Sequence, residues 1–199
     1  MVHISVMSGK LKGIPAINTN TLSNAFCTAM HNAKKSVICA WCYSHNMLSG
    51  SRKNCVARFE ENSRLLAEWI PWEELPVFNS LWVRFHGHGE LQNMAHLENF
   101  HRIALKNPRT ICTLWTKRRD LISQYHRKFT QPNNLILIYS NPIIDRVIAR
   151  PPTGFNRVFN NVSQHDNLEN CTGRICTECL SCYSQDGDRM IVERVKIRH

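Results

Sequence analysis

Apolar residues follow two different periods along the chain, and together they predict alternating strands and helices. Short segments that alternate or are continuously apolar predict strands at residues 13–21, 81–87, 109–116 and 133–142. Apolar residues three or four positions apart predict amphipathic helices at residues 51–69, 94–107 and 118–129. The helix faces expected in the core carry Val56, Phe59, Leu65, Leu66 and Trp69, and Leu97, Phe100, Ile103, Ala104 and Leu105.

Strands and helices that alternate at this spacing predict right-handed βαβ units, and hence an α/β fold with a mainly parallel sheet. The continuous apolar run at 133–142 is typical of a parallel strand that is buried on both faces. Residues 22–50 are expected to be rich in loops. After Asp145 the pattern becomes irregular, with a short strand predicted at 157–163 and a closing strand at 189–197.

The composition narrows the class of protein. The chain has no apolar run that could span a bilayer, and its N-terminus lacks the features of a secretory signal, so we expect a cytoplasmic protein that binds no membrane. In a reducing cytoplasm, nine cysteines indicate metal or redox chemistry rather than disulfides. The net charge of +10 favours an anionic partner, such as nucleic acid or a nucleotide, although the basic residues are scattered.

Seven of the cysteines fall into two sets. Set one is Cys27, Cys39 and Cys42, and set two is Cys171, Cys176, Cys179 and Cys182. Four cysteines in so short a segment predict a metal site, and their spacing is closer to that of iron–sulfur ligands than of zinc ligands, with zinc as the alternative. The other two, Cys55 on a predicted helix and Cys112 on a predicted strand, are interpreted as packed structural residues.

Set one has a second interpretation, a redox dithiol formed by Cys39 and Cys42. Such a dithiol of the thioredoxin type requires a helix that begins at the cysteines, directly after a strand. The residues that follow Cys42 are polar and are interrupted by Gly50, which predicts no immediate helix, and Cys27 adds a third thiol. Both features favour a metal site.

Polar residues stand at the ends of three consecutive predicted strands, where α/β proteins bind ligands. They are Gly87, Gly89 and Glu90 after the first, Thr116 and Lys117 after the second, and Ser140 and Asn141 after the third. The glycines would let the backbone approach a ligand, and Glu90 offers a carboxylate for an amine. His86 and His88 are further candidates, but with cysteines present we do not expect histidine ligands.

The loop that ends in Cys39-Ala40-Trp41-Cys42 resembles the cluster loop of radical S-adenosylmethionine (SAM) enzymes, although the gap between Cys27 and Cys39 is longer than usual there. The sequence GHGE at 87–90 is similar to the Gly-Gly-Glu that ends the second strand in that superfamily. The resemblance implies a partial (βα) barrel in residues 1–150, with the cysteine-rich segment 151–199 closing on it. It also implies that Trp41 shields the cluster from solvent.

For the site, the same resemblance implies a [4Fe–4S] cluster on Cys27, Cys39 and Cys42. SAM would be held by Glu90 with help from Ser140 and Asn141. Set two would hold an auxiliary cluster, and an electron-donor protein would be a partner. The substrate that the charge favours is a nucleotide or nucleic acid, and nothing in the sequence specifies the oligomeric state.

Most of the chain, from about residue 5 to 182, resembles a phage family called gene product 88-like. The resemblance rests on MSGKLKGIPAINTNT, on Cys-x2-Cys-Tyr, on the strand-end GE and on LWTK at 114–117. It implies a location in the cytoplasm of the host cell, and the family brings no assigned activity.

Two further hypotheses stay open. One is a non-catalytic phage module, stabilised by zinc or an iron–sulfur cluster, that binds nucleic acid or protein; the charge and the aromatic residues Trp41, Tyr43, Trp115 and Tyr183 would support it. The other merges the two cysteine sets around a single cluster.

Overall fold

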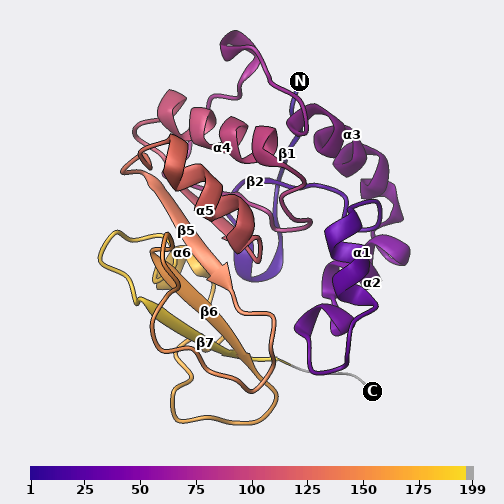
Figure 1. Ribbon diagram of the computed structural model, residues 1–199, viewed down its shortest axis with the longest axis vertical. Coiled ribbons are helices and arrows are strands. Elements are labelled where there is room, and N and C mark those ends of the chain that lie inside the picture. Colours follow the sequence, from indigo (N-terminus) through magenta and orange to yellow (C-terminus); the bar gives the residue numbers. More distant parts are fainter. Residues whose placement is uncertain (196–199) are drawn as a thin grey trace.

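The computed structural model describes residues 1–195 and contains one seven-stranded sheet (Figure 1). The strands lie in the sheet in their order along the chain: β1 (Ile4–Ser5), β2 (Ala16–Ile17), β3 (Trp82–Phe85), β4 (Ile111–Thr116), β5 (Leu135–Ser140), β6 (Arg157–Val162) and β7 (Met190–Arg194). β1 is antiparallel to β2, and each later strand is parallel to the one before it. The prediction of an α/β fold with a mainly parallel sheet is therefore confirmed.

Helices occupy most of the connections between parallel strands. The α-helices are α1 (Ala25–His31), α2 (Tyr43–Ser49), α3 (Val56–Leu66), α4 (Met94–Lys106), α5 (Arg119–Lys128) and α6 (Cys176–Cys179). Short 3-10 helices are η1 (Gly9–Leu11), η2 (Ile38–Trp41), η3 (Lys53–Cys55) and η4 (Trp72–Glu74). The predicted strands at 81–87, 109–116 and 133–142 and the helices at 94–107 and 118–129 correspond to β3, β4, β5, α4 and α5.

The two faces of the sheet have different coverings, because strand side chains alternate between faces. Val83, Phe85, Leu114 and Leu137 belong to a large core shared with α4 and α5. On the opposite face, Trp115 and neighbouring isoleucines of β5 pack with Tyr183, Cys176 and Cys182 of the C-terminal segment. Figure 1 shows α4 and α5 along one side of β5 and α6 beyond its other side.

The prediction that residues 22–50 are rich in loops is wrong, because this stretch forms α1, η2 and α2. Its two α-helices have only seven residues each, too few to show the apolar period that indicates a longer helix. α1 is started by Asn24, whose side-chain oxygen accepts a hydrogen bond from the Cys27 amide. The predicted closing strand appears as β7, and its expected residues 196–197 lie outside the described part of the chain.

Two predicted core residues are on the surface. Trp69 is 63% exposed because α3 ends at Leu66, and Leu105 is 50% exposed because it lies off the buried face of α4. In α3, the polar residues Asn62 and Ser63 are buried instead and bond to neighbouring groups of the protein. Periodicity alone does not distinguish such satisfied polar residues from solvent-facing ones.

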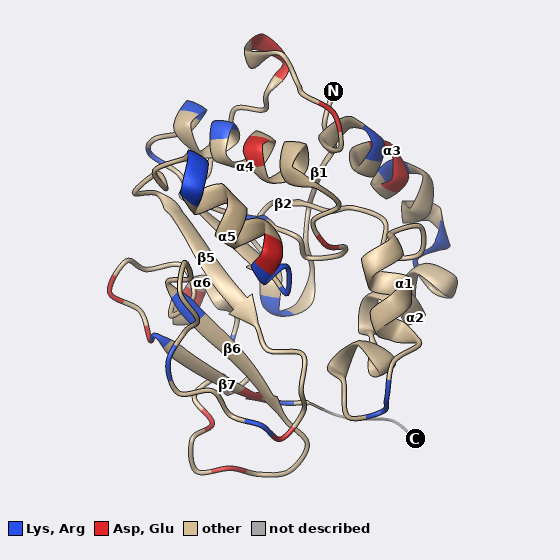
Figure 2. Cartoon of the chain, in the orientation of Figure 1, with Lys and Arg blue, Asp and Glu red and all other residues tan. Residues whose placement is uncertain are grey.

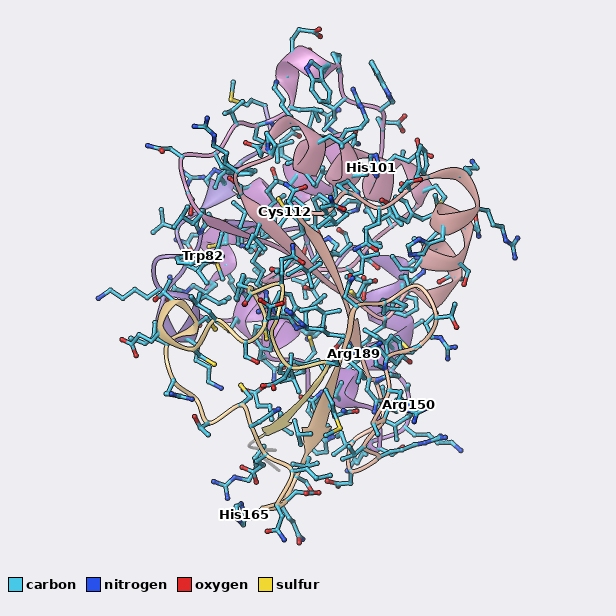
Figure 3. The ribbon with its side chains drawn as sticks, turned by 90° about the vertical axis from the view of Figure 1, so that its left-hand side faces the viewer. Trp82, His101, Cys112, Arg150, His165 and Arg189 are labelled. Carbon is cyan, nitrogen blue, oxygen red and sulfur yellow. The ribbon has the colours of Figure 1, made fainter. Side chains whose placement is uncertain are left out.

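Cys112 is fully buried in β4, as predicted, and lies in the interior of the molecule in Figure 3. Burial raises the pKa of its thiol to about 12. Within residues 1–195, none of the helices has the length and apolar character that crossing a membrane requires.

Candidate metal and cofactor site at the carboxyl ends of the strands

The first cysteine of set one is held beside the end of β3 by the cap of α1. Asn24 accepts a hydrogen bond from the Cys27 amide (3.0 Å), and its side-chain nitrogen donates to the backbone carbonyl of Glu90 (2.9 Å). Asn24 is 2% exposed, so both bonds are shielded from water. One buried amide therefore fixes Cys27 relative to Glu90, a residue 63 positions away in the sequence.

The loop with Cys39 and Cys42 lies over the residues that follow β5. The amide of Ile38 donates to the carbonyl of Pro142 (2.8 Å), and the amide of Ile144 donates to the carbonyl of Ser36 (2.9 Å). α2 begins directly after Cys42, so the expectation that no helix follows these cysteines is wrong. A helix after the cysteines is one feature that the dithiol interpretation requires. The other, a strand directly before them, is not met, because η2 precedes α2.

Tyr43 and Ser44, the first two residues of α2, join this loop to the HGHGE segment. The Tyr43 hydroxyl donates to the carbonyl of Gly87, and the Ser44 hydroxyl is 2.8 Å from Nδ1 of His88. His31 in α1 contacts the carbonyl of Cys39 through its Nδ1 (3.0 Å) and stacks on His45 of α2. The three cysteine-bearing elements are thus fastened to one another and to the end of β3.

Gly87 and Gly89 must be glycines because residues 18 and 19 pack closely against them. A Cβ atom on Gly87 would lie 2.7 Å from the side-chain oxygen of Asn18, and one on Gly89 would lie 1.9 Å from the hydroxyl of Thr19. Gly89 also has a φ of +93°, which side chains rarely adopt. The sequence indicated that these glycines make room for a ligand, whereas the structure uses the room for the segment after β2.

His86 and His88 do not lie together as a ligand pair. Nε2 of His86 is 3.2 Å from Nε2 of His96 in α4, whereas His88 contacts Ser44. Burial lowers the pKa of His88 to about 4 and that of His96 to about 3, so these imidazoles are neutral at pH 7. Both fasten the end of β3 to neighbouring helices.

Glu90 lies at the centre of the polar strand ends. Its carboxylate accepts hydrogen bonds from the Thr116 hydroxyl (2.5 Å) and from the amides of Lys117 and Leu91 (2.8 Å each). Burial raises the pKa of Glu90, and the positive charge of Lys117 and these hydrogen bonds oppose that effect. The Lys117 ammonium group donates to the Ser140 hydroxyl (2.9 Å), so four of the predicted binding residues form one connected network.

Asn141 is used differently from the expectation. Its side-chain nitrogen donates to Asn160 and to the carbonyl of Arg146, and its oxygen accepts from the amide of Ile143. It is 1% exposed and shapes the loop after β5, on which the cysteine loop rests.

The three thiols of set one share an electrostatic environment with Glu90 and Lys117. Burial raises the pKa of Cys27 and of Cys39; the Glu90 carboxylate and the neighbouring thiols of the set raise both further, and Lys117 opposes the rise. In the metal-free chain these two thiols are therefore protonated at pH 7. Cys55 is not among the groups that act on Cys27 or Cys39.

Three thiols beside one ammonium group are a donor set that fits an iron–sulfur cluster or zinc. Among residues 1–195, however, no three Cys, His, Asp or Glu side chains have converged to metal-binding distances. The thiols would close on a metal as it binds and displaces their protons. Trp41 donates its indole N–H to the carbonyl of Lys35, and its role as a shield stays a prediction.

Set two lies on the sheet face opposite α4 and α5. The backbone of Cys171 forms an isolated β-bridge with that of Glu193 in β7. Cys176 and Cys179 are the first and last residues of α6, and Cys182 packs against the core cluster that contains Trp115. Burial raises the pKa of Cys171 and Cys176, and raises that of Cys182 to about 12. Lys10 in η1 forms an ion pair with Glu193 and adds a positive charge near Cys171 and Cys176.

Arg84, which the sequence analysis did not select, lies near set two and contacts two of the aromatic residues that it did name. Arg84 of β3 stacks on Trp115, with its guanidinium carbon 3.8 Å from the ring centroid, and acts electrostatically on Cys176 and Cys182. Tyr43 is near both Cys42 and Arg84. A usable signal was present, since an arginine in the middle of an apolar strand is rarely buried without a partner.

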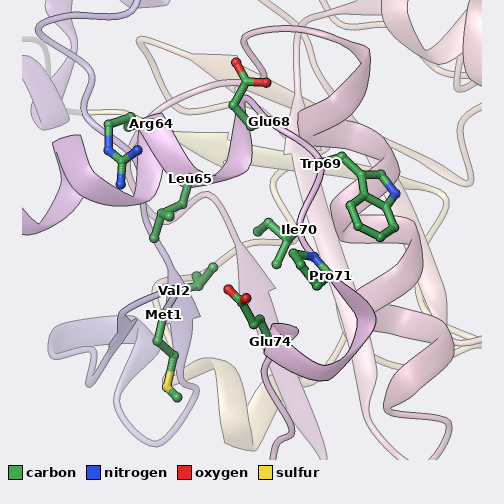
Figure 4. A pocket seen from close by; sticks show the side chains of 9 residues that line it. All are labelled: Met1, Val2, Arg64, Leu65, Glu68, Trp69, Ile70, Pro71 and Glu74. Atoms are coloured by element: carbon green, nitrogen blue, oxygen red, sulfur yellow. The ribbon is translucent and has the colours of Figure 1, made fainter.

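Two surface features lie away from these sets. Figure 2 shows Lys and Arg spread over α3, α4, α5 and the β6–β7 end of the molecule, with Asp and Glu among them. Figure 4 shows a small pocket between the N-terminus and the end of α3, lined by residues that include Val2, Trp69, Ile70 and Glu74. It contains no residue of either cysteine set.

Comparison with models of protein families identifies the family of the chain. The family model described as gene product 88 matches residues 7–150, which is more than half of the chain. That range contains set one and the polar strand ends, whereas set two lies beyond it. Neither the curated proteins nor the solved structures give a match.

Proposed function

The chain belongs to the gene product 88 family, and we propose that it is an iron–sulfur protein that binds a [4Fe–4S] cluster at Cys27, Cys39 and Cys42 and holds SAM beside it. The observation that carries the proposal is the placement of these three thiols around Lys117 and Glu90 at one edge of the sheet. The sequential parallel order of β2 to β7 is also the strand order of a partial (βα) barrel.

The residues of this chain would divide the work of binding. The thiols would ligate iron, and Lys117 would balance part of the negative charge of the thiolates. A carboxylate has about four acceptor sites, and protein donors use three of those of Glu90. The remaining site would accept a hydrogen bond from the amino group of SAM. Gly87 and Gly89 act indirectly, by letting residues 18 and 19 support the loop that carries Glu90.

When bound, the cluster and SAM would supply one-electron reductive cleavage of SAM and radical abstraction of hydrogen from a substrate. An electron-donor protein would supply the electron. Set two would hold a second cluster, and Arg84 and Lys10 would offset the charge of its thiolates. The positive net charge favours a nucleotide or nucleic acid as substrate.

The experiment is anaerobic reconstitution with iron and sulfide, followed by dithionite and SAM. We expect iron–sulfur absorbance and formation of 5′-deoxyadenosine in the wild type. Cys42→Ser should abolish 5′-deoxyadenosine, and Cys55→Ser should be unaffected because Cys55 is separate from the thiol group. A cluster that forms but neither binds nor cleaves SAM would contradict the catalytic part of the proposal.

A second candidate is the non-catalytic metal-stabilised module that binds nucleic acid or protein. It is favoured by the state of Glu90, whose oxygens already have three donors from the protein and so are explained without a ligand. Metal analysis of anaerobically purified protein distinguishes the candidates. Zinc without acid-labile sulfide would favour the module, and iron with sulfide would favour the cluster.

A further inference from the structure

Arg84 is held in a single position on the sheet face opposite α4 and α5. Its neighbours Val83 and Phe85 are fully buried in the core under the helices, so the Arg84 side chain points to the other face. There its guanidinium carbon lies 3.8 Å from the centroid of the Trp115 ring, and its Nε donates to the carbonyl of His86 (3.2 Å). Trp115 is only 8% exposed and packs in turn against Tyr183.

The charge of Arg84 has no carboxylate partner in the part of the chain that the structure describes. None of the ion pairs within residues 1–195 includes Arg84. The side chains nearest to its charge are the phenols of Tyr43 and Tyr183 and the thiol of Cys182. The Tyr43 hydroxyl donates its hydrogen to the carbonyl of Gly87, and the Tyr183 ring is 1% exposed and packs on Trp115, so within residues 1–195 no carboxylate forms an ion pair with the guanidinium group.

A partly buried arginine that has no ion-pair partner is suited to bind an oxyanion. A partly buried guanidinium without a counter-charge loses hydration without compensation, and an arriving carboxylate or phosphate restores the balance. Nε donates to the carbonyl of His86 and the Tyr183 hydroxyl lies beside the guanidinium group, so the terminal nitrogens together with that hydroxyl can donate to the oxygens of one planar group. The contact with Trp115 and the bond to His86 restrain the guanidinium group before a ligand arrives, so little side-chain entropy is lost on binding.

The position of Arg84 relates its guanidinium group to the strand-end site. Trp115, on which Arg84 lies, is followed directly by Thr116 and Lys117, the two residues that bond to Glu90. Arg84 precedes Glu90 by six residues on β3 and its following loop, and Tyr43 links it to Cys42 of set one. A molecule bound at Arg84 would therefore lie below the polar strand ends, on the side of set two.

We propose that Arg84, positioned by Trp115, binds the carboxylate or phosphate group of the substrate. This inference deepens the proposed function, on which it rests for the reaction, by assigning the substrate to the class of oxyanion-bearing molecules. The competing role is that Arg84 serves only as the counter-charge of metal-bound thiolates at Cys176 and Cys182.

The test is calorimetric titration of the reconstituted protein with inorganic phosphate and, separately, with succinate, at constant ionic strength. We expect one site per chain for at least one of the two anions. Arg84→Gln should weaken binding at least about tenfold, and Arg84→Lys should weaken it less because the charge remains without the guanidinium group. The matched control is Arg102→Gln, which removes an arginine stacked on Trp69 on the outer surface and should leave binding unchanged.

Iron content and SAM cleavage, measured on the same samples, separate the outcomes. Full iron content with lost anion binding in Arg84→Gln supports the proposal, whether or not SAM is cleaved. Equal anion binding in the wild type and Arg84→Gln overturns it. Loss of iron in Arg84→Gln but not in Arg84→Lys, with no anion binding by the wild type, assigns the counter-charge role instead.

Discussion

Single residues at the end of β3 are constrained by their neighbours in the protein. Glu90 has three internal donors, His86 and His88 bond to side chains of α4 and α2, and Gly89 packs against Thr19. These contacts hold the segment in one conformation, and a site for SAM would gain from that order because the loop needs no rearrangement.

Gly89→Ala should destabilise the fold strongly. Its new Cβ would lie 1.9 Å from the Thr19 hydroxyl, and the φ of +93° is unfavourable for alanine, so we expect a loss of roughly 3 kcal/mol in the free energy of unfolding. Gly9→Ala is the matched control, because Gly9 also has a positive φ but has nothing within 4 Å of the new atom. It should cost only about 1 kcal/mol. Equal losses in urea denaturation would show that the close contact with Thr19 carries no cost.

The buried imidazoles predict a dependence of stability on pH. The folded-state pKa of His88 is about 4 and that of His96 about 3, both lowered by burial from 6.5. Below pH 6.5 the unfolded chain therefore takes up protons that the folded chain does not, and stability falls as the pH falls. Each histidine contributes up to about 1.4 kcal/mol per pH unit between pH 6 and 5.

Denaturation at several pH values and fixed metal content checks this dependence. His96→Gln should flatten the slope between pH 6.5 and 5, because it removes one of these two buried imidazoles. A slope that is the same in the wild type and in His96→Gln would mean that His96 is charged in the folded chain.

At the scale of elements, the sequence predicted the long strands and helices and missed the short helices around the cysteines. β4 and β5 consist almost entirely of buried apolar residues, and such runs are recognised locally. α1 and α2 have only seven residues each and are supported by tertiary contacts such as Asn24 with Glu90 and Ser44 with His88. Contacts between residues so far apart in the chain leave no periodic signal in either segment.

The candidate site was predictable to the extent that chemistry follows residue type. Thiols and strand-end carboxylates could be selected from the sequence, because few other functions explain so many cysteines in one short segment. An arginine within an apolar strand could have been selected as well, but the role proposed for Arg84 depends on the absence of an ion-pair partner in space within residues 1–195, which the sequence does not show. Asn141 shows the reverse case, a polar strand-end residue whose hydrogen-bonding groups are used within its own loop.

The cap of α1 connects element stability to the site. Asn24→Ala removes the bond to the Cys27 amide and the bond to the Glu90 carbonyl, so it should cost about 1 kcal/mol or more and lower the iron retained after reconstitution. Asn93→Ala is a close match, because Asn93 caps α4 and its side-chain nitrogen also donates to a backbone carbonyl. It should cost a similar free energy without loss of iron. Equal iron loss in both variants would indicate general destabilisation.

At the scale of the whole molecule, the two cysteine sets lie on different elements, set one on α1 and η2 and directly before α2, and set two on α6 and its flanking loops beside β7. The groups that act on Cys27 and Cys39 include no cysteine of set two, and those that act on Cys171, Cys176 and Cys182 include none of set one. The side chains of Tyr43, Arg84 and Trp115 lie between them. This arrangement favours two metal centres over the alternative of one cluster shared by both sets.

Iron counting on paired variants tests that independence. In reconstituted protein we expect about eight irons per chain, because each [4Fe–4S] cluster holds about four. Cys171→Ser with Cys176→Ser should remove about half of the iron and leave SAM cleavage measurable, since set one and Glu90 are intact. Cys27→Ser with Cys39→Ser should remove the other half and abolish cleavage. If either double variant loses all of its iron while Cys55→Ser loses none, the sets share one cluster, and Arg84 then lies beside that cluster rather than between two.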